Sequence, residues 1–269
     1  MPGKIRVGFK ALENIPVKEV TPDRIHGLFF SLLDEKTAKK LHDIKGLKPF
    51  TLYSPLFFTE SEETTDFIPL EITFLNDELF SETTTAVVLN ANRKNLKLGE
   101  VSLKVLRGFR IQDGDIVSYE TLLETAAPER DIIMDFFSPT SFKKGQFDFP
   151  LPLPELIFKS LINKWNTFSS IKLNPKELIP EIRNHIHISG CWIRTTKIEL
   201  ASLKKITGFK GRVLLFNSSK NTDFQKTVSA LANFSTFSSV GRKTTMGFGK
   251  VRIPATTERK FRESFLQNP

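Results

Sequence analysis

The apolar residues of this chain predict the same order of secondary structure twice, and this repetition limits the fold more than any other feature. In the first part, alternating apolar side chains indicate strands, and apolar side chains at helical spacing indicate helices. The predicted elements are a strand over 4–12, a helix from Thr21 to Leu33, strands over 50–58 and 68–74, a weaker helix over 77–89 and a strand over 101–111. This order, β-α-β-β-α-β, is that of the ferredoxin-like unit.

The second part of the chain repeats the order. It consists of a strand over 131–137, a helix over 152–168, strands over 185–200 and 208–216, a helix over 223–237 and a closing strand over 249–253. We therefore predict an α+β protein of two tandem ferredoxin-like (RRM-like) domains, 1–125 and 126–255. The linker is expected near 112–129, and a charged tail over 256–269.

Positive charge is concentrated near the C-terminal end. The chain has a formal net charge of +9, and the stretch from Arg194 to Arg252 holds twelve Lys or Arg residues against two acids. A basic region of this kind is the electrostatic footprint expected of a protein that binds a polyanion such as nucleic acid. The alternative is a basic surface that only keeps the protein soluble.

Cysteine and hydropathy exclude several classes of protein. Cys191 is the single cysteine, so the chain can form no internal disulfide and no thiolate cluster for zinc, and we expect a cytoplasmic protein. No apolar run approaches the roughly 20 residues that span a bilayer, so we expect no membrane partner. Most of the 25 phenylalanines should be core, and a few exposed ones could stack on unpaired bases.

Residues 239–252, the glycine-rich segment, combine three glycines with two threonines and four cations. Glycine lets the backbone approach a ligand closely and adopt positive φ, and main-chain amides in such a loop can form an anion nest. We therefore predict a phosphate-binding site here. Its residues are Gly241, Arg242, Lys243, Thr244, Thr245, Gly247, Gly249 and Lys250.

Two familiar phosphate-binding motifs do not fit the segment. In a P-loop, four residues separate the first glycine from the glycine of the Gly-Lys-Ser/Thr ending. Here five residues separate Gly241 from Gly247, and Phe248 stands in place of the lysine. A dinucleotide fingerprint opens a helix, whereas this segment runs into a predicted strand. The remaining alternative is a tight hairpin turn with incidental charge.

In its position and its order of residues, the glycine-rich segment strongly resembles the signature of the CRISPR-associated repeat-RNA endoribonucleases. This family belongs to the RAMP superfamily and cuts precursor CRISPR RNA inside its repeats. Residues 41–51, Leu-His-Asp-Ile-Lys-Gly-Leu-Lys-Pro-Phe-Thr, resemble the N-terminal active-site region of the same family. There a histidine after the first helix is followed by a lysine and then by a Phe-Thr strand. The resemblance extends to about Ile253 and implies an endoribonuclease built from two ferredoxin-like domains.

The resemblance also implies the chemistry. RNA carries its own nucleophile, the 2′-OH, so the enzyme needs only a base, an acid and a cation near the phosphate. His42 would be the acid–base residue, and Lys48 would stabilise the phosphate. The products would be a 2′,3′-cyclic phosphate and a 5′-OH, and the reaction would need no metal or other cofactor.

His26 is a second candidate for proton transfer. Some members of the family carry a tyrosine on the first helix that assists the histidine, but the nearest position here is Phe30, which cannot transfer a proton. One straight helix over 22–44 would place His26 and His42 roughly 24 Å apart. We instead expect a turn at Asp34, so that the two imidazoles face each other across a helical hairpin. The alternative for His26 is a structural hydrogen bond.

Basic residues on or between the two central strands of the second domain are expected to grip an RNA stem by its phosphates. They are Arg194, Lys197, Lys204, Lys205, Lys210 and Arg212. The expected partner is CRISPR repeat RNA, with proteins of a CRISPR effector complex as further partners, and the chain is expected to be a monomer or a homodimer.

Other readings of the sequence stay open. His185 and His187 alternate on a predicted strand, where a solvated strand face is favoured over a metal pair because no third ligand stands nearby. A noncatalytic RNA-binding subunit of an effector complex would share the fold and the glycine-rich segment. An unrelated basic RNA-binding protein is the third reading.

Overall fold

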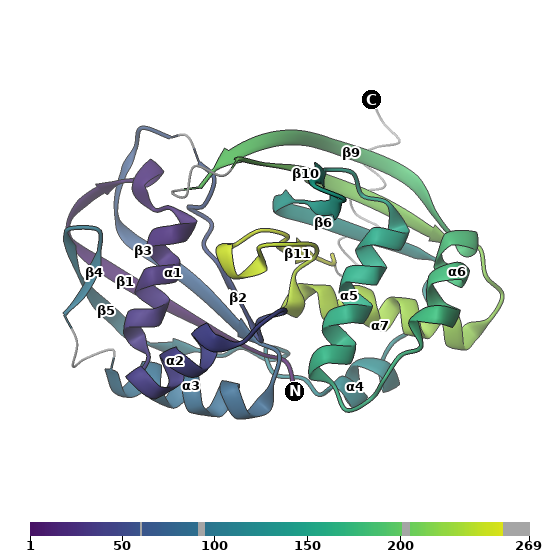
Figure 1. Ribbon diagram of the computed structural model, residues 1–269, viewed down its shortest axis with the longest axis horizontal. Helices are drawn as coiled ribbons and strands as arrows, with labels where there is room; N and C mark the ends of the chain where they lie inside the picture. Colours follow the sequence, from purple (N-terminus) through teal and green to yellow (C-terminus); the bar gives the residue numbers. More distant parts are fainter. Residues whose placement is uncertain (60, 91–94, 201–204, 255–269) are drawn as a thin grey trace.

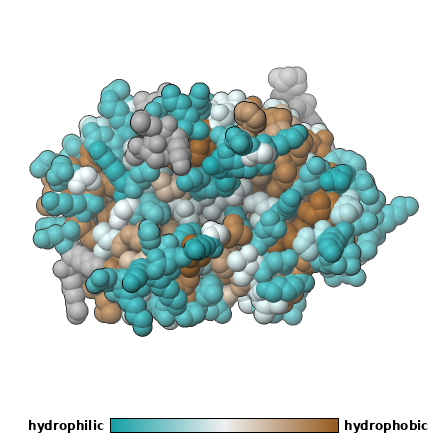
Figure 2. Space-filling view, in the orientation of Figure 1, coloured by the Kyte–Doolittle hydropathy of each residue, from teal (hydrophilic) through white to brown (hydrophobic). Residues whose placement is uncertain are grey.

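The computed structural model describes residues 1–59, 61–90, 95–200 and 205–254. Its two larger sheets are antiparallel and lie side by side, each covered by its own helices (Figure 1). Hydrophilic side chains cover most of the face shown in Figure 2, with apolar patches interspersed among them. Within the described ranges, no helix has the length and apolar character needed to cross a membrane.

The first sheet has the strand order β2-β3-β1-β5-β4. Its elements are β1 (Gly3–Pro16), α1 (Pro22–Leu32), α2 (Glu35–Asp43), β2 (Phe50–Tyr53), β3 (Thr64–Phe74), α3 (Asp77–Asn90), β4 (Leu96–Leu98) and β5 (Val101–Arg110). A core that includes Phe29, Phe50 and Phe74 fills the space between helices and sheet.

The second sheet has the order β11-β6-β10-β9. Its elements are β6 (Asp131–Thr140), α5 (Pro154–Phe168), α6 (Pro175–His185), β9 (Ile186–Glu199), β10 (Lys205–Asn217), α7 (Thr222–Ser238) and β11 (Val251–Arg252). In both sheets the fourth strand of the unit pairs with the first, the first with the third and the third with the second. The predicted fold class, two tandem ferredoxin-like domains, is confirmed.

The predicted turn between the first two helices is also confirmed. Leu32 ends α1, and Asp34 caps α2 because its carboxylate accepts hydrogen bonds from the amide (2.9 Å) and the hydroxyl (2.8 Å) of Thr37. A side chain that satisfies the free amides of a first turn fixes where a helix begins.

Several element boundaries were wrong. The strand predicted over 50–58 ends at Tyr53, because Ser54 begins a turn that the Phe57 amide closes at 3.0 Å. The strand predicted over 249–253 is reduced to β11, and His185 ends a helix instead of beginning a strand. The sequence did not predict α4 (Tyr119–Glu124), α6, β4 or the hairpin of β7 (Phe142–Lys144) and β8 (Phe147–Phe149). Lys204 and the tail over 256–269 lie outside the described residues.

The second core includes Trp165, Phe234 and, from α4, Tyr119 and Leu122. These α4 residues precede the predicted boundary at 125/126, which stays a prediction.

The glycine-rich segment follows α7 in the second domain and lies between the two sheets (Figure 1, yellow). Its 3₁₀ turn η2 (Thr244–Met246) contacts α1 and β2 of the first domain. Gly247 lies so close to the Phe57 ring that an added Cβ would stand 2.3 Å from it. The segment therefore belongs to one domain by sequence and packs against the other.

Candidate active site

His42 stands in the last turn of α2 with its side chain 83% exposed, and its Nδ1 lies 3.5 Å from a carboxylate oxygen of Asp43. The end of this helix is held by Lys48. The Lys48 ammonium donates to the carbonyl oxygens of Leu41 (2.8 Å), His42 (2.8 Å) and Ile44 (2.5 Å). Carbonyls at a helix C-terminus have no partner within the helix, so a cation there both satisfies them and favours the helix dipole.

His26 lies on α1, half-buried beside two aromatic rings. Its ring centroid is 4.8 Å from that of Phe30 and 6.2 Å from that of Phe50. Burial lowers the pKa of His26, and the positive charges of Lys243, Lys48 and His42 lower it further, against an opposing effect of Asp23. The site thus favours a neutral imidazole.

The charges that act on His26 belong to groups of two other segments, and contacts link these segments: η2, directly after Lys243, contacts α1, and Lys48 is bonded to the His42 carbonyl. His26 comes from α1, His42 and Lys48 come from the end of α2 and the loop after it, and Lys243 comes from the glycine-rich segment. The turn at Asp34 makes this possible, because it folds α2 back instead of carrying His42 away from His26. Lys243 is exposed, and no carboxylate of the described residues lies within ion-pair distance of it.

Positive φ and close packing explain the glycines of the segment. Gly241, Gly247 and Gly249 have φ values of 80°, 77° and 74°. A Cβ on Gly249 would stand 1.8 Å from the carbonyl oxygen of Val240, which no neighbour can accommodate.

Several main-chain amides of this segment are bonded inside the protein, and the predicted phosphate site stays a prediction. The Gly241 amide donates to the Ser160 hydroxyl, and the amides of Arg242 and Gly249 donate to the carbonyls of Ser141 and Pro139. The amide of Lys250 donates to the Ser138 hydroxyl (2.8 Å). These donors are used inside the protein, so an anion at this segment would be left with the amides of residues 243–245 and the Lys243 ammonium.

Four of the cations predicted to bind RNA are paired with carboxylates, Lys205 among them. Lys250 pairs with Glu71 of the first domain, with its side chain only 12% exposed, and Arg242 pairs with Asp148 of the β7–β8 hairpin. Arg212 forms two hydrogen bonds to Asp135, of 2.6 and 2.8 Å. Arg252 pairs with the same carboxylate. Burial alone would raise the pKa of Asp135, but these two guanidinium groups hold it below its ordinary value.

The strand cations separate into two faces. Arg194 and Lys210 are direct cross-strand partners on β9 and β10 and share one face, whereas Lys197 lies on the other because strand residues alternate. Burial lowers the pKa of Lys210, and the charge of Arg194 lowers it further. Lys205 pairs with Glu199 at 3.5 Å.

His185 and His187 both approach the Ser218 hydroxyl, at 3.4 and 3.3 Å. The described part of the chain has no group of three or more His, Cys, Asp or Glu residues that could hold a metal.

One buried cation behind the segment was missed by sequence reasoning. Lys164 of α5 is 3% exposed and donates to the carbonyls of Ser238 (2.9 Å) and Ser239 (2.8 Å), where α7 passes into the glycine-rich segment. Burial lowers the pKa of Lys164 to about 7. A sequence signal exists, since Lys164 stands among the apolar residues Leu161, Ile162 and Trp165 of one helix.

The chain is similar to known proteins of one family. The family model described as CRISPR-associated endoribonuclease Cas6 matches residues 134–251. A curated relative of that name from Mycobacterium tuberculosis is 28% identical over 137 residues, 50% of this chain and 43% of the relative. The matched region therefore spans less than half the length of that relative.

Solved structures extend the similarity to nearly the whole chain. A Cas6 product complex is 30% identical, with a TM-score of 0.79 over 94% of this chain and 100% of that one. A structure of Thermus thermophilus Cas6 is 27% identical, with a TM-score of 0.73 over 94% and 98% of the two chains.

Proposed function

The chain belongs to the Cas6 family of CRISPR-associated endoribonucleases, and from this premise we propose that it cleaves precursor CRISPR RNA within its repeats. The observation that carries the proposal is the packing of η2, directly after Lys243, against the helix of His26, together with the Lys48 bond to the His42 carbonyl and the electrostatic effect of all three groups on His26. Internal cleavage of RNA needs a base, an acid and a cation near the phosphate, and these segments supply such groups.

In the proposed reaction the 2′-oxygen next to the scissile phosphate attacks phosphorus as the base removes its proton. The bond to the 5′-oxygen breaks, and the acid protonates that oxygen. The products are a 2′,3′-cyclic phosphate and a 5′-OH. The neutral, half-buried His26 fits the base, and the exposed His42 fits the acid.

The two lysines have different tasks in this proposal. Lys243 is exposed on the glycine-rich segment and stabilises the charge that develops on the phosphate oxygens. Lys48 adds positive charge to the site and, through its three carbonyl bonds, fixes the helix turn that carries His42.

The experiment that tests the function uses end-labelled repeat RNA from the protein's own genome, in excess EDTA. We expect a single cut, no cut when the nucleotide 5′ to the cleavage point is 2′-deoxy, and an unchanged cut when a nucleotide elsewhere is 2′-deoxy. A cut that survives the first substitution would exclude the 2′-OH as nucleophile. Tight binding without a cut would favour a noncatalytic RNA-binding subunit.

If His26 is the base, it should determine how the cleavage rate depends on pH. A base must be neutral to accept a proton, and a lowered pKa keeps His26 neutral at pH values where an ordinary histidine is largely protonated. We expect the single-turnover rate to fall on the acid side only as the pH drops below this lowered pKa. His26→Ala should lose this limb and slow cleavage at least about tenfold. An unchanged rate constant would remove His26 from the mechanism.

A further inference from the structure

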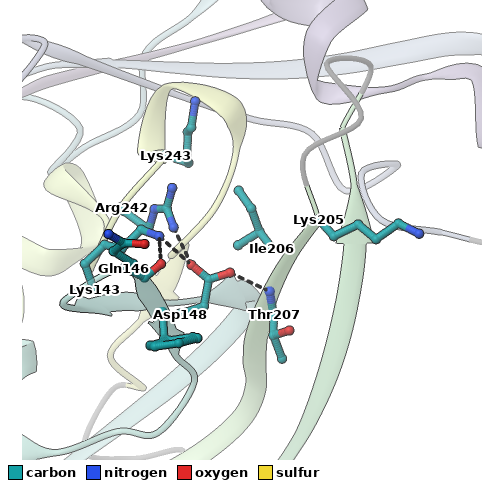
Figure 3. Close-up of a pocket in the computed structure, with 9 residues that line it drawn as sticks. Lys143, Gln146, Asp148, Lys205, Ile206, Thr207, Arg242 and Lys243 are labelled. Atoms are coloured by element: carbon teal, nitrogen blue, oxygen red, sulfur yellow. Dashed lines mark hydrogen bonds and ion pairs between the residues drawn. The ribbon is translucent and has the colours of Figure 1, made fainter.

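A cavity of about 520 Å³ lies next to the candidate active site, between the β7–β8 hairpin, the start of β10 and the glycine-rich segment (Figure 3). Its volume is in the range of sites that bind small molecules. It is lined by Lys143, Gln146, Phe147, Asp148, Lys205, Ile206, Thr207, Arg242 and Lys243. Neither the family similarity nor the proposed cleavage mechanism assigns a role to it.

One carboxylate organises the walls of this cavity. Asp148 pairs with Arg242, lies 3.5 Å from the Lys143 ammonium and accepts a hydrogen bond of 3.2 Å from the Thr207 amide. It thereby joins the hairpin to β10 and to the glycine-rich segment. Figure 3 shows Lys205 and Lys243 pointing away from Asp148. Of the four basic side chains that line the cavity, Arg242 pairs with Asp148 and Lys205 with Glu199, whereas Lys243 has no carboxylate partner among the described residues, so positive charge is left to attract anions.

The cavity also has an aromatic wall. Phe147 begins β8, directly after the hairpin turn, and is 79% exposed, more than any other large apolar side chain of the described residues. The exposed face of this ring can stack on a flat ligand, and the neighbouring cations favour a ligand that also carries negative charge. A nucleotide has both, and exposed aromatic rings are the usual stacking platforms for unpaired bases.

We propose that this cavity holds one unpaired nucleotide of the RNA, with its base stacked on Phe147 and its phosphate near Lys143 and Lys243. Lys243 lines the cavity and directly precedes η2, which contacts α1, the helix that carries His26, so the nucleotide in the cavity flanks the phosphate that is cut. The inference rests on the proposed function for its position in the repeat, but the stacking itself does not depend on cleavage.

The test is equilibrium binding, at low salt, of repeat RNA that is 2′-deoxy at the nucleotide 5′ to the cut, so that it stays intact, and that carries 2-aminopurine at single positions around the cut. In the unaltered protein we expect one position to show quenched fluorescence as its base stacks. Phe147→Ala should abolish that quenching and raise the Kd about tenfold. Phe147→Tyr should restore both, because the stacking ring returns. Phe137→Ala is the matched control, since Phe137 is also exposed (46%) but does not line the cavity.

A second probe separates this proposal from the proposed function. A short single-stranded RNA without the repeat sequence should also bind less tightly to Phe147→Ala, because stacking tolerates any base. Loss of this binding in a protein that cuts no repeat RNA would support the nucleotide site and reject the nuclease. Normal cleavage, an unchanged Kd and unchanged quenching in a folded Phe147→Ala protein would overturn the nucleotide site alone.

Discussion

We expect His42→Ala to lower the single-turnover rate of repeat cleavage about 10²- to 10⁴-fold, the usual contribution of a general acid or base. The Kd for the RNA should change little. The exposed imidazole makes one approach to a neighbouring side chain, at Asp43, so its removal leaves the helix end and the Lys48 bonds in place. The measurement is cleavage at RNA-saturating protein, paired with a binding titration of a 2′-deoxy substrate.

His187→Ala is the control for this variant. His187 is an exposed histidine on β9, and its contact with Ser218 does not involve the glycine-rich segment. Its variant should cleave at the rate of the unaltered protein. If His42→Ala cut the RNA at nearly the normal rate, another group would have to protonate the leaving oxygen, and the mechanism built on His42 would be wrong.

The second large effect concerns stability. Gly249→Ala should reduce the free energy of unfolding by about 2–5 kcal/mol. A left-handed backbone costs an alanine about 1–2 kcal/mol, and forcing a Cβ against the Val240 carbonyl costs about 1–3 kcal/mol more. The midpoint of urea unfolding measures the change. RNA affinity should fall as well, because the same backbone shift displaces Lys243.

Gly27→Ala is the control, and it should change the free energy of unfolding in the opposite direction. Gly27 lies inside α1, where an added Cβ meets nothing within 4 Å, so alanine should raise the free energy of unfolding by up to about 1 kcal/mol. Equal midpoints for Gly249→Ala and the unaltered protein would mean that the segment relaxes without cost. The close packing described for it would then be wrong.

The fold was predictable wherever a long segment has one apolar face. The periodicity of α1, α5 and α7, and the alternation of β1, follow directly from burying one face of the element in the core of its domain. The elements that were missed lack this signal. The β7 and β8 strands have three residues each, and α6 carries Pro180 in its interior and buries only Ile182.

The sequence predicted the local motifs of the candidate site but not the ion pairs that its cations form. The segment around His42 and the spacing of the glycines are visible in the sequence. The carboxylates that pair with the cations are not visible in the sequence, because Glu71 lies 179 residues from Lys250 and Asp148 lies 94 residues from Arg242. A count of basic residues therefore overestimated the charge left for RNA. It also could not show that Lys48 is engaged with the end of α2.

The packing of the glycine-rich segment against the first domain has a consequence for protein synthesis. The ribosome makes the chain from the N-terminus, and domains generally fold as units in that order. His26, His42 and Lys48 therefore emerge first, whereas Lys243, Gly247 and the Lys250 that pairs with Glu71 are translated much later. A nascent chain holds only part of the candidate site while it is still attached beside messenger RNA. Phe57 and Glu71 of the first domain gain their contacts with Gly247 and Lys250 only when the second domain has folded.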